Sequence, residues 1–152
     1  MAKFLLRSAL IIVVLFTVSC TFTSTRINSE ADNDDGKDFL GVFYYSIGNK
    51  NFNAVDTLIS DSLKKIAGAD GVSKIVKFIN KKAGAYKGYD IVDHYIKHIS
   101  GSINETVYNY KLNVSYEKGI VNELVTLRKE GYKPIRMIGY HAYSNLLIDS
   151  LK

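Results

Sequence analysis

The spacing of apolar residues divides the chain after residue 37 into a helical half and a strand half. Apolar side chains recur at helical intervals in three segments, which begin near Asp38, Phe52 and Asp70. Gly48 follows the first segment and Gly84 the third, and glycine readily takes the left-handed conformation that ends helices. The pattern therefore predicts about three helices between residues 38 and 84.

Further along the chain, apolar residues recur at every second position. In Thr106–Tyr116 the even positions from Tyr108 onward are apolar or aromatic and their odd neighbours are polar, which is typical of a strand with one buried face. Pro134 lies at the start of the last apolar run, where a missing N–H is tolerated. Together with Thr106–Tyr116, the predicted strands are Tyr89–Ser100, Ile120–Lys129 and Ile135–Tyr143.

Helices followed by strands joined through short turns indicate an α+β fold. Antiparallel sheets commonly have one face packed on a core. We expect residues 38–152 to form a single α+β domain, in which about three N-terminal helices pack on a curved four-stranded antiparallel sheet.

The first 19 residues have the pattern of a secretory signal peptide. Lys3 and Arg7 precede an uncharged apolar run, Ala9–Val18. A run of this length matches the signal-peptide range of about 7–15 residues. It is shorter than the roughly 20 apolar residues of a membrane-spanning helix. We therefore expect residues 1–19 to be removed on export.

The apolar run leads to the only cysteine of the chain, in the order Thr17-Val18-Ser19-Cys20. This segment resembles the lipobox of bacterial lipoproteins, although an aliphatic residue is usual where Thr17 stands. The resemblance implies cleavage before Cys20 and attachment of palmitate-type lipid chains to that residue. Thr21, rather than aspartate, follows the cysteine, which implies a place in the bacterial cell envelope, on the outer membrane facing the periplasm. The alternative is a buried cysteine that lies near a signal peptide by chance.

Residues 20–37 are rich in serine, threonine, asparagine and aspartate, and include the segment "EADNDDG". Such a stretch has too little apolar surface to order itself. We expect it to be a flexible polar tether between the lipidated Cys20 and the domain. Two acyl chains hold a protein stably on a bilayer, whereas one gives only reversible binding.

Composition excludes several classes of function. A single cysteine cannot form an internal disulfide, and the three histidines have no second cysteine or spaced acidic partner to complete a metal site. Of the 20 basic residues, Lys3 and Arg7 belong to the leader, which leaves 18 against 15 acidic residues, an excess of +3. Because these lysines are scattered rather than gathered in a stripe, we expect no nucleic-acid partner. No metal or cofactor is predicted.

Two segments resemble the nuclear transport factor 2-like superfamily (SnoaL-related, cystatin-like), close to its exported families of unknown function. They are "GNKNFNAVDTLIS" and "NYKLNVSYEKGIVNELVTLRKEGYKPIRMIGYHAY". Glu123 fits a glutamate of the family pattern, Gly139 and Tyr140 fit its glycine-tyrosine pair, and Pro134 or Ile135 stands where tryptophan is common. The resemblance implies a cone-shaped cavity between helices and sheet, used for catalysis by some members and for binding by others. It also implies a possible homodimer.

The favoured interpretation is a non-enzymatic domain that binds a small apolar ligand or an envelope protein. Its candidate pocket residues are His94, Tyr110, Tyr140 and His141. For Tyr110, core or cross-strand packing is favoured over a place in a ligand site, because aromatic side chains suit half-buried sheets.

The alternative is a small hydrolase, dehydratase or isomerase. It would use Asp93, His94 and His141, with Tyr95 or Tyr140, as acid, base and oxyanion groups. Successive residues of a strand point to opposite faces, so Asp93 and His94 cannot form a couple on one strand.

Overall fold

The computed structural model describes residues 23–148, so the predicted signal peptide and Cys20 lie outside the described residues. In chain order, the elements are β1 (Ser24–Ile27), α2 (Glu30–Gly48), α3 (Phe52–Thr57), α4 (Asp61–Ala67), α5 (Gly71–Ala83), β2 (Tyr86–Ser100), β3 (Glu105–Tyr116), β4 (Gly119–Glu130), β5 (Arg136–Tyr143) and the short 3₁₀ helix η1 (Asn145–Leu147).

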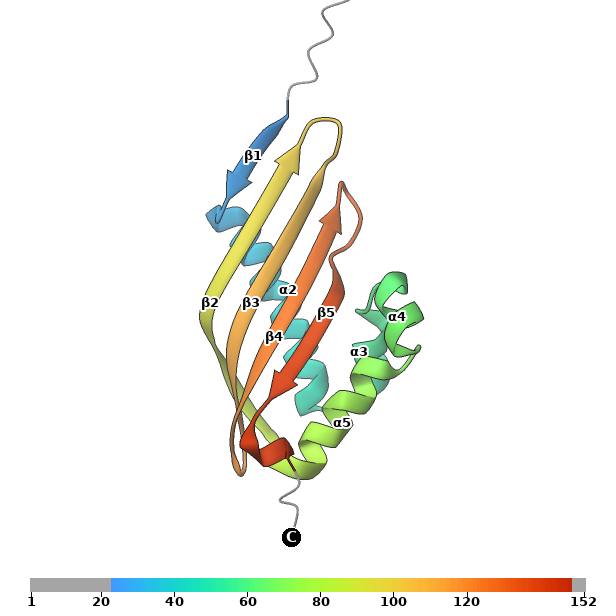
Figure 1. Ribbon diagram of the computed structural model, residues 1–152, viewed down its shortest axis with the longest axis vertical. Coiled ribbons are helices and arrows are strands. Elements are labelled where there is room, and N and C mark those ends of the chain that lie inside the picture. The colour runs from blue at the N-terminus through green and yellow to red at the C-terminus, as the bar shows by residue number, and fades with distance from the viewer. Residues whose placement is uncertain (1–22, 149–152) are drawn as a thin grey trace, which may run out of the picture.

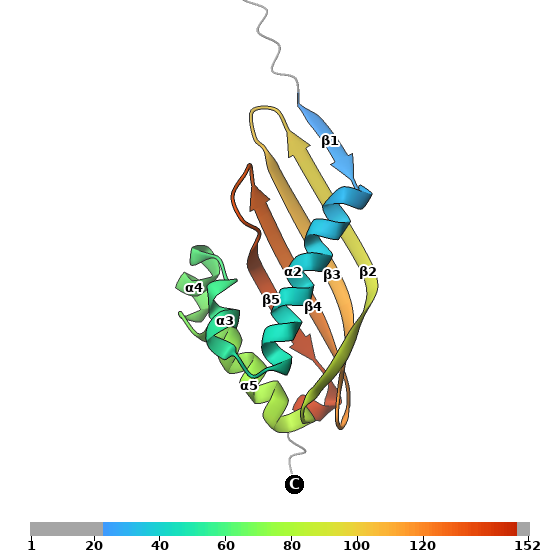
Figure 2. The ribbon, with the colours of Figure 1, turned by 180° about the vertical axis from the view of Figure 1, so that it is seen from behind.

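The strands form one antiparallel sheet in the order β1-β2-β3-β4-β5 (Figure 1). The α+β class and the order of helices before the meander are confirmed. The sheet has five strands rather than the predicted four, because β1 joins the edge of β2. Figure 2 shows α2 lying across one face of the sheet, with α3, α4 and α5 beside β5. The described helices leave the other face uncovered.

The first helix is longer than predicted and begins at Glu30 instead of Asp38. Ser29 caps it, because its hydroxyl accepts a hydrogen bond from the backbone N–H of Asp32. Apolar spacing could not show this start, since the first two turns bury Asp32 and Gly36 rather than large apolar side chains. The buried apolar side chains of the helix begin only at Phe39.

The predicted second helix is two short ones, α3 and α4. Between them, the chain runs beside β5: the N–H of Met137 donates to the carbonyl of Leu58, and the N–H of Ser60 donates to the carbonyl of Met137. Ile59 and Met137 pair as a parallel bridge. The segment Leu58–Ser60 therefore covers the first part of the β5 edge, and the same apolar residues that suggested a helix pack against the sheet.

Most of the predicted tether is ordered. Residues 24–27 pair with the end of β2, and residues 30–37 belong to α2. The guanidinium of Arg26 donates to both carboxylate oxygens of Asp32 at 2.8 to 3.0 Å, which fastens β1 to α2. Burial raises the pKa of the Asp32 carboxyl, but the hydroxyl of Ser29 and the guanidinium outweigh that effect, and the pKa is lowered. Polar side chains hold this segment in place. A composition rich in polar residues is also typical of flexible segments, so the sequence suggested a tether.

The alternation predicted in β3 is confirmed. Every even position from Thr106 to Tyr116 is buried, with at most 4% of its surface exposed. These side chains face α2 and pack with Phe43 and Tyr44 of the helix in the core. The space between helix and sheet is therefore occupied by aromatic and aliphatic side chains, including the completely buried Tyr108.

Two glycines of α2 give opposite predictions for substitution by alanine. A Cβ at Gly36 would lie 2.0 Å from the hydroxyl oxygen of the buried Tyr110, whereas a Cβ at Gly41 would meet nothing within 4 Å. Gly41→Ala is expected to raise the free energy of unfolding by up to about 1 kcal/mol, since alanine favours a helix over glycine. Gly36→Ala is expected to lower it by about 2 kcal/mol through overpacking.

Urea unfolding of both variants measures the difference. Because the two sites lie in the same helix, intrinsic helix propensity cancels between them. Equal stabilisation by the two alanines would show that α2 does not pack closely on Tyr110.

Candidate functional site

The centre of the sheet holds a buried carboxylate. Glu123 lies in β4 on the face that packs against α2, and none of its surface is exposed. One carboxylate oxygen accepts hydrogen bonds from the hydroxyls of Tyr44 and Tyr140, at 2.8 and 2.7 Å. The other accepts from the hydroxyl of Tyr116 at 3.0 Å. Three tyrosines from α2, β3 and β5 thus enclose one acid, and we call these four residues the Glu123 cage.

Burial sets the electrostatics of the Glu123 cage. Removal from water raises the pKa of the Glu123 carboxyl, and the three donated hydrogen bonds reduce this rise without cancelling it. Burial and the neighbouring carboxylate raise the pKa values of Tyr44, Tyr116 and Tyr140 well above their usual value of 10.0. All four groups therefore favour their protonated forms more strongly than they would in water.

Aromatic rings surround the cage. The ring of Tyr44 stacks on Tyr89 and Tyr86, with centroid distances of 4.5 and 5.5 Å. Phe43 meets Tyr44 edge-on at 5.0 Å. A carboxylate whose two oxygens are both occupied, behind such rings, is placed to hold elements together rather than to meet a substrate.

The four predicted pocket residues are divided between the two faces of the sheet. His94 pairs with Tyr110 across β2 and β3, and their rings lie 6.3 Å apart on the α2 side. Tyr140 also faces α2, where it belongs to the Glu123 cage. His141 is exposed on the opposite face, with its ring 6.2 Å from that of Tyr143. Thus His141 does not join the others.

The residues of the enzyme alternative are separated in the same way. Asp93 is exposed and forms an ion pair with Lys111, at 3.4 Å. Tyr95 is 48% exposed, next to His94 on the strand but on the other face. Within residues 23–148, no group of histidine, cysteine, aspartate and glutamate side chains could hold a metal ion. None of the helices in this range is both long and apolar enough to cross a bilayer.

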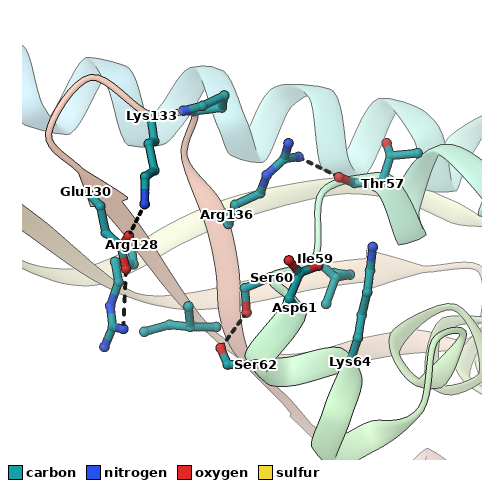
Figure 3. A pocket seen from close by; sticks show the side chains of 12 residues that line it. Thr57, Ile59, Ser60, Asp61, Ser62, Lys64, Arg128, Glu130, Lys133 and Arg136 are labelled. Atoms are coloured by element: carbon teal, nitrogen blue, oxygen red, sulfur yellow. Dashed lines mark hydrogen bonds and ion pairs between the residues drawn. The ribbon is translucent and has the colours of Figure 1, made fainter.

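A groove of about 530 Å³ lies where the α3–α4 connection and the start of α4 face the β4–β5 hairpin (Figure 3). Its lining combines apolar side chains with charged and hydroxyl-bearing ones. None of the predicted pocket residues lines it. The lining residues are Thr57, Ile59, Ser60, Asp61, Ser62, Lys64, Arg128, Glu130, Lys133, Pro134, Arg136 and Ile138.

The charges of the groove are unbalanced, with four basic side chains against two acidic ones. On the hairpin wall, Lys133 donates to Glu130 at 2.9 Å, and Arg128 lies 2.7 Å from Glu105, just outside the groove. Arg136 donates from one nitrogen to the carbonyl of Thr57 at 2.5 Å, which leaves most of its five N–H donors for other partners.

The opposite wall supplies Lys64, which forms no ion pair with any residue in the described range. Figure 3 shows Lys64 and Arg136 on either side of Asp61. Pockets of 300–1,000 Å³ with a few polar groups are typical of small-molecule sites. A guanidinium and an ammonium at one such site favour an anionic group.

Sequence reasoning did not find this groove, because its walls are about 70 residues apart along the chain. They are brought together by tertiary contacts, such as the bridge of Ile59 with Met137 and the hydrogen bond of Arg136 to Thr57. The basic segment around Lys133 was the one visible signal. Comparisons of the chain with protein-family models, with curated proteins and with solved structures gave no match.

Proposed function

We propose that this protein is a lipid-anchored component of the bacterial cell envelope, on the outer membrane facing the periplasm, whose folded domain binds a ligand without catalysis. The anchor is supported by the sequence: an apolar leader that ends at Ser19-Cys20 resembles a lipobox. Intact mass of membrane-extracted protein tests the anchor, since acylated Cys20 without residues 1–19 is expected.

The separation of the candidate catalytic groups favours binding over catalysis. Asp93 and His141 are exposed on the face opposite α2, whereas His94 lies on the α2 face. The acid that is best shielded from water, Glu123, already accepts three hydrogen bonds. The order of helices before an antiparallel meander also supports kinship with the nuclear transport factor 2-like superfamily, which includes many binding proteins.

The observation that carries the binding function is the excess positive charge of the groove. Lys64 forms no ion pair within residues 23–148, and the one hydrogen bond of Arg136 to Thr57 leaves other donors of its guanidinium on the facing wall. We infer that the groove holds a small anionic molecule, whose carboxylate or phosphate is bound by these two side chains. Ile59, Pro134 and Ile138 offer apolar contacts to the rest of the ligand.

Citrate and inorganic phosphate are suitable probes for this site. Added to protein that lacks residues 1–19 and carries Cys20→Ser, they are expected to shift the amide resonances of residues 57–64 and 128–138. Lys64→Gln is expected to weaken citrate binding about tenfold, because a charge-assisted hydrogen bond is worth about 1.5–3 kcal/mol. Titration followed by NMR measures both effects.

Lys97→Gln is the matched control, since it removes the same charge from an exposed lysine that lies on β2, away from the groove. This variant is expected to bind citrate as the parent does. Equal losses in the two variants, or shifts spread over the whole surface, would show non-specific attraction of anions and contradict a site in the groove.

A further inference from the structure

We propose that the end of the domain at which β1 begins rests directly on the bilayer, with Ile103 and Tyr132 in contact with the lipid interface. This inference rests on the proposed lipid anchor at Cys20. It goes beyond the anchor because it fixes which surface of the domain meets the membrane and how closely.

The first argument is the length of the connection. Ser24, the first residue of β1, is four residues after Cys20. A fully extended chain spans at most about 3.6 Å per residue, so the lipidated residue lies within roughly 14 Å of the sheet. A tether that reached to residue 37 would allow several times that distance. Since β1 is held by its strand pairing and by Arg26, the domain cannot stand far from the lipid.

The second argument is the direction in which the chain enters the sheet. Ser24 pairs with Ser100, the last residue of β2, directly before the β2–β3 connection. Figure 1 shows the start of β1 beside this connection, at the end of the molecule opposite η1. The lipid anchor therefore pulls the β2–β3 connection, rather than α5 or η1, towards the membrane.

The third argument is the chemistry of this end. The β2–β3 and β4–β5 connections lie side by side, because the N–H of Gly131 donates to the carbonyl of Asn104 at 2.8 Å. Each presents one large apolar side chain: Ile103 is 59% exposed, and Tyr132 is fully exposed. Tyrosine favours the boundary between lipid and water, where its ring contacts acyl chains and its hydroxyl stays hydrated.

This placement also locates the groove. Lys133 and Pro134, which follow Tyr132 in the same connection, line the groove wall. Contact of Tyr132 with lipid therefore brings the groove close to the headgroup layer, where its anionic ligand would enter from the water beside the membrane.

Introduced tryptophans test the contact, since the chain contains no tryptophan of its own. The lipidated full chain with Ile103→Trp or Tyr132→Trp would be reconstituted into vesicles of phosphatidylethanolamine and phosphatidylglycerol whose acyl chains carry bromine. Side chains at the interface lie near the acyl boundary, so we expect quenching of about twofold or more for both variants. Tyr143→Trp is the control: Tyr143 is 51% exposed at the end of β5 nearest η1, and its variant is expected to stay unquenched.

Flotation of the same samples separates this inference from the proposed anchor. If the wild type fails to float with vesicles, or if Cys20→Ser floats equally well, the anchor itself is wrong. If the wild type floats only with Cys20 present, yet the tryptophans at positions 103 and 132 emit as in lipid-free buffer, the anchor stands and the docking orientation is overturned. Quenching of the Tyr143→Trp variant to the same extent would overturn it too.

Discussion

Glu123→Ala is expected to lower the free energy of unfolding by about 3 kcal/mol, because it leaves the hydroxyls of three tyrosines without their acceptor in the core. Tyr44 and Tyr116 are at most 4% exposed, so water cannot easily replace the lost carboxylate. Each buried polar group without a partner costs about 1–3 kcal/mol, and removal of the side chain also leaves a cavity. Release of the carboxylate from its own burial offsets part of this loss.

Denaturation in urea, followed by circular dichroism, measures this change. Glu123→Gln is the conservative variant: it keeps the shape and one acceptor oxygen, and we expect a loss of about 1 kcal/mol. Tyr116→Phe removes one donor and leaves the carboxylate with two, so its loss should also be near 1 kcal/mol. If Glu123→Ala proved as stable as the parent, the Glu123 cage would not be what joins α2, β3 and β5.

The predicted strands were found in the structure because their burial is one-sided. Tyr108, Leu112 and Val114 of β3 are buried, while their polar neighbours point away, so the period of two appears directly in the sequence. The strand β1 gives no such signal, because all four of its residues are exposed. Its place in the sheet depends on backbone pairing and on Arg26, neither of which leaves an apolar pattern.

The start of α2 also leaves no apolar pattern in the sequence. The residues that could have revealed it are polar: Ser29 at the cap position and Asp32 in the first turn are a known signature of a helix start. A search for caps, rather than for apolar spacing, would have placed the helix at Glu30 and shortened the predicted tether.

The candidate sites required tertiary contacts that no local pattern contains. Glu123 could be matched to a family pattern, but one of its hydrogen-bond donors, Tyr44, is 79 residues away in the chain. The alternation of strands did predict that neighbours such as Asp93 and His94 face opposite sides. The same rule separates His141 from Tyr140, but which of the two shares a face with His94 and Tyr110 depends on how the strands pair.

Unfolding at alkaline pH is the second large effect that the structure predicts. Burial raises the pKa of seven of the 11 tyrosines, and that of Tyr108 to about 12. A group whose pKa is raised on folding stabilises the fold fully below its unfolded pKa, here near 10, and this stability is lost as the pH rises above that value. The other six are Tyr44, Tyr86, Tyr89, Tyr110, Tyr116 and Tyr140.

The loss of folding stability per pH unit depends on how many tyrosine hydroxyls keep their protons in the folded state but lose them in the unfolded state. Each tyrosine that is neutral when folded and ionised when unfolded lowers the stability by about 1.4 kcal/mol per pH unit. Tyr44, Tyr108, Tyr110 and Tyr116 are almost completely buried, so together they give roughly 5–6 kcal/mol per unit. Since a domain of this kind is stable by about 5–15 kcal/mol, we expect cooperative unfolding within about two pH units above 10.

Glu123 also makes the fold less stable as the pH rises, but at lower pH than the tyrosines do. Its raised pKa means that the contribution of its protonated form is complete below the usual value of 4.5 and is lost as the pH rises through its folded pKa. Tyrosinate absorbance and circular dichroism, recorded together in a pH titration, measure the alkaline transition. The part of the absorbance change that comes from the buried tyrosines is expected to occur in the same step as the loss of the circular dichroism signal. Smooth ionisation of all 11 tyrosines with the fold intact would contradict it, because the hydroxyls around Glu123 would then be open to water.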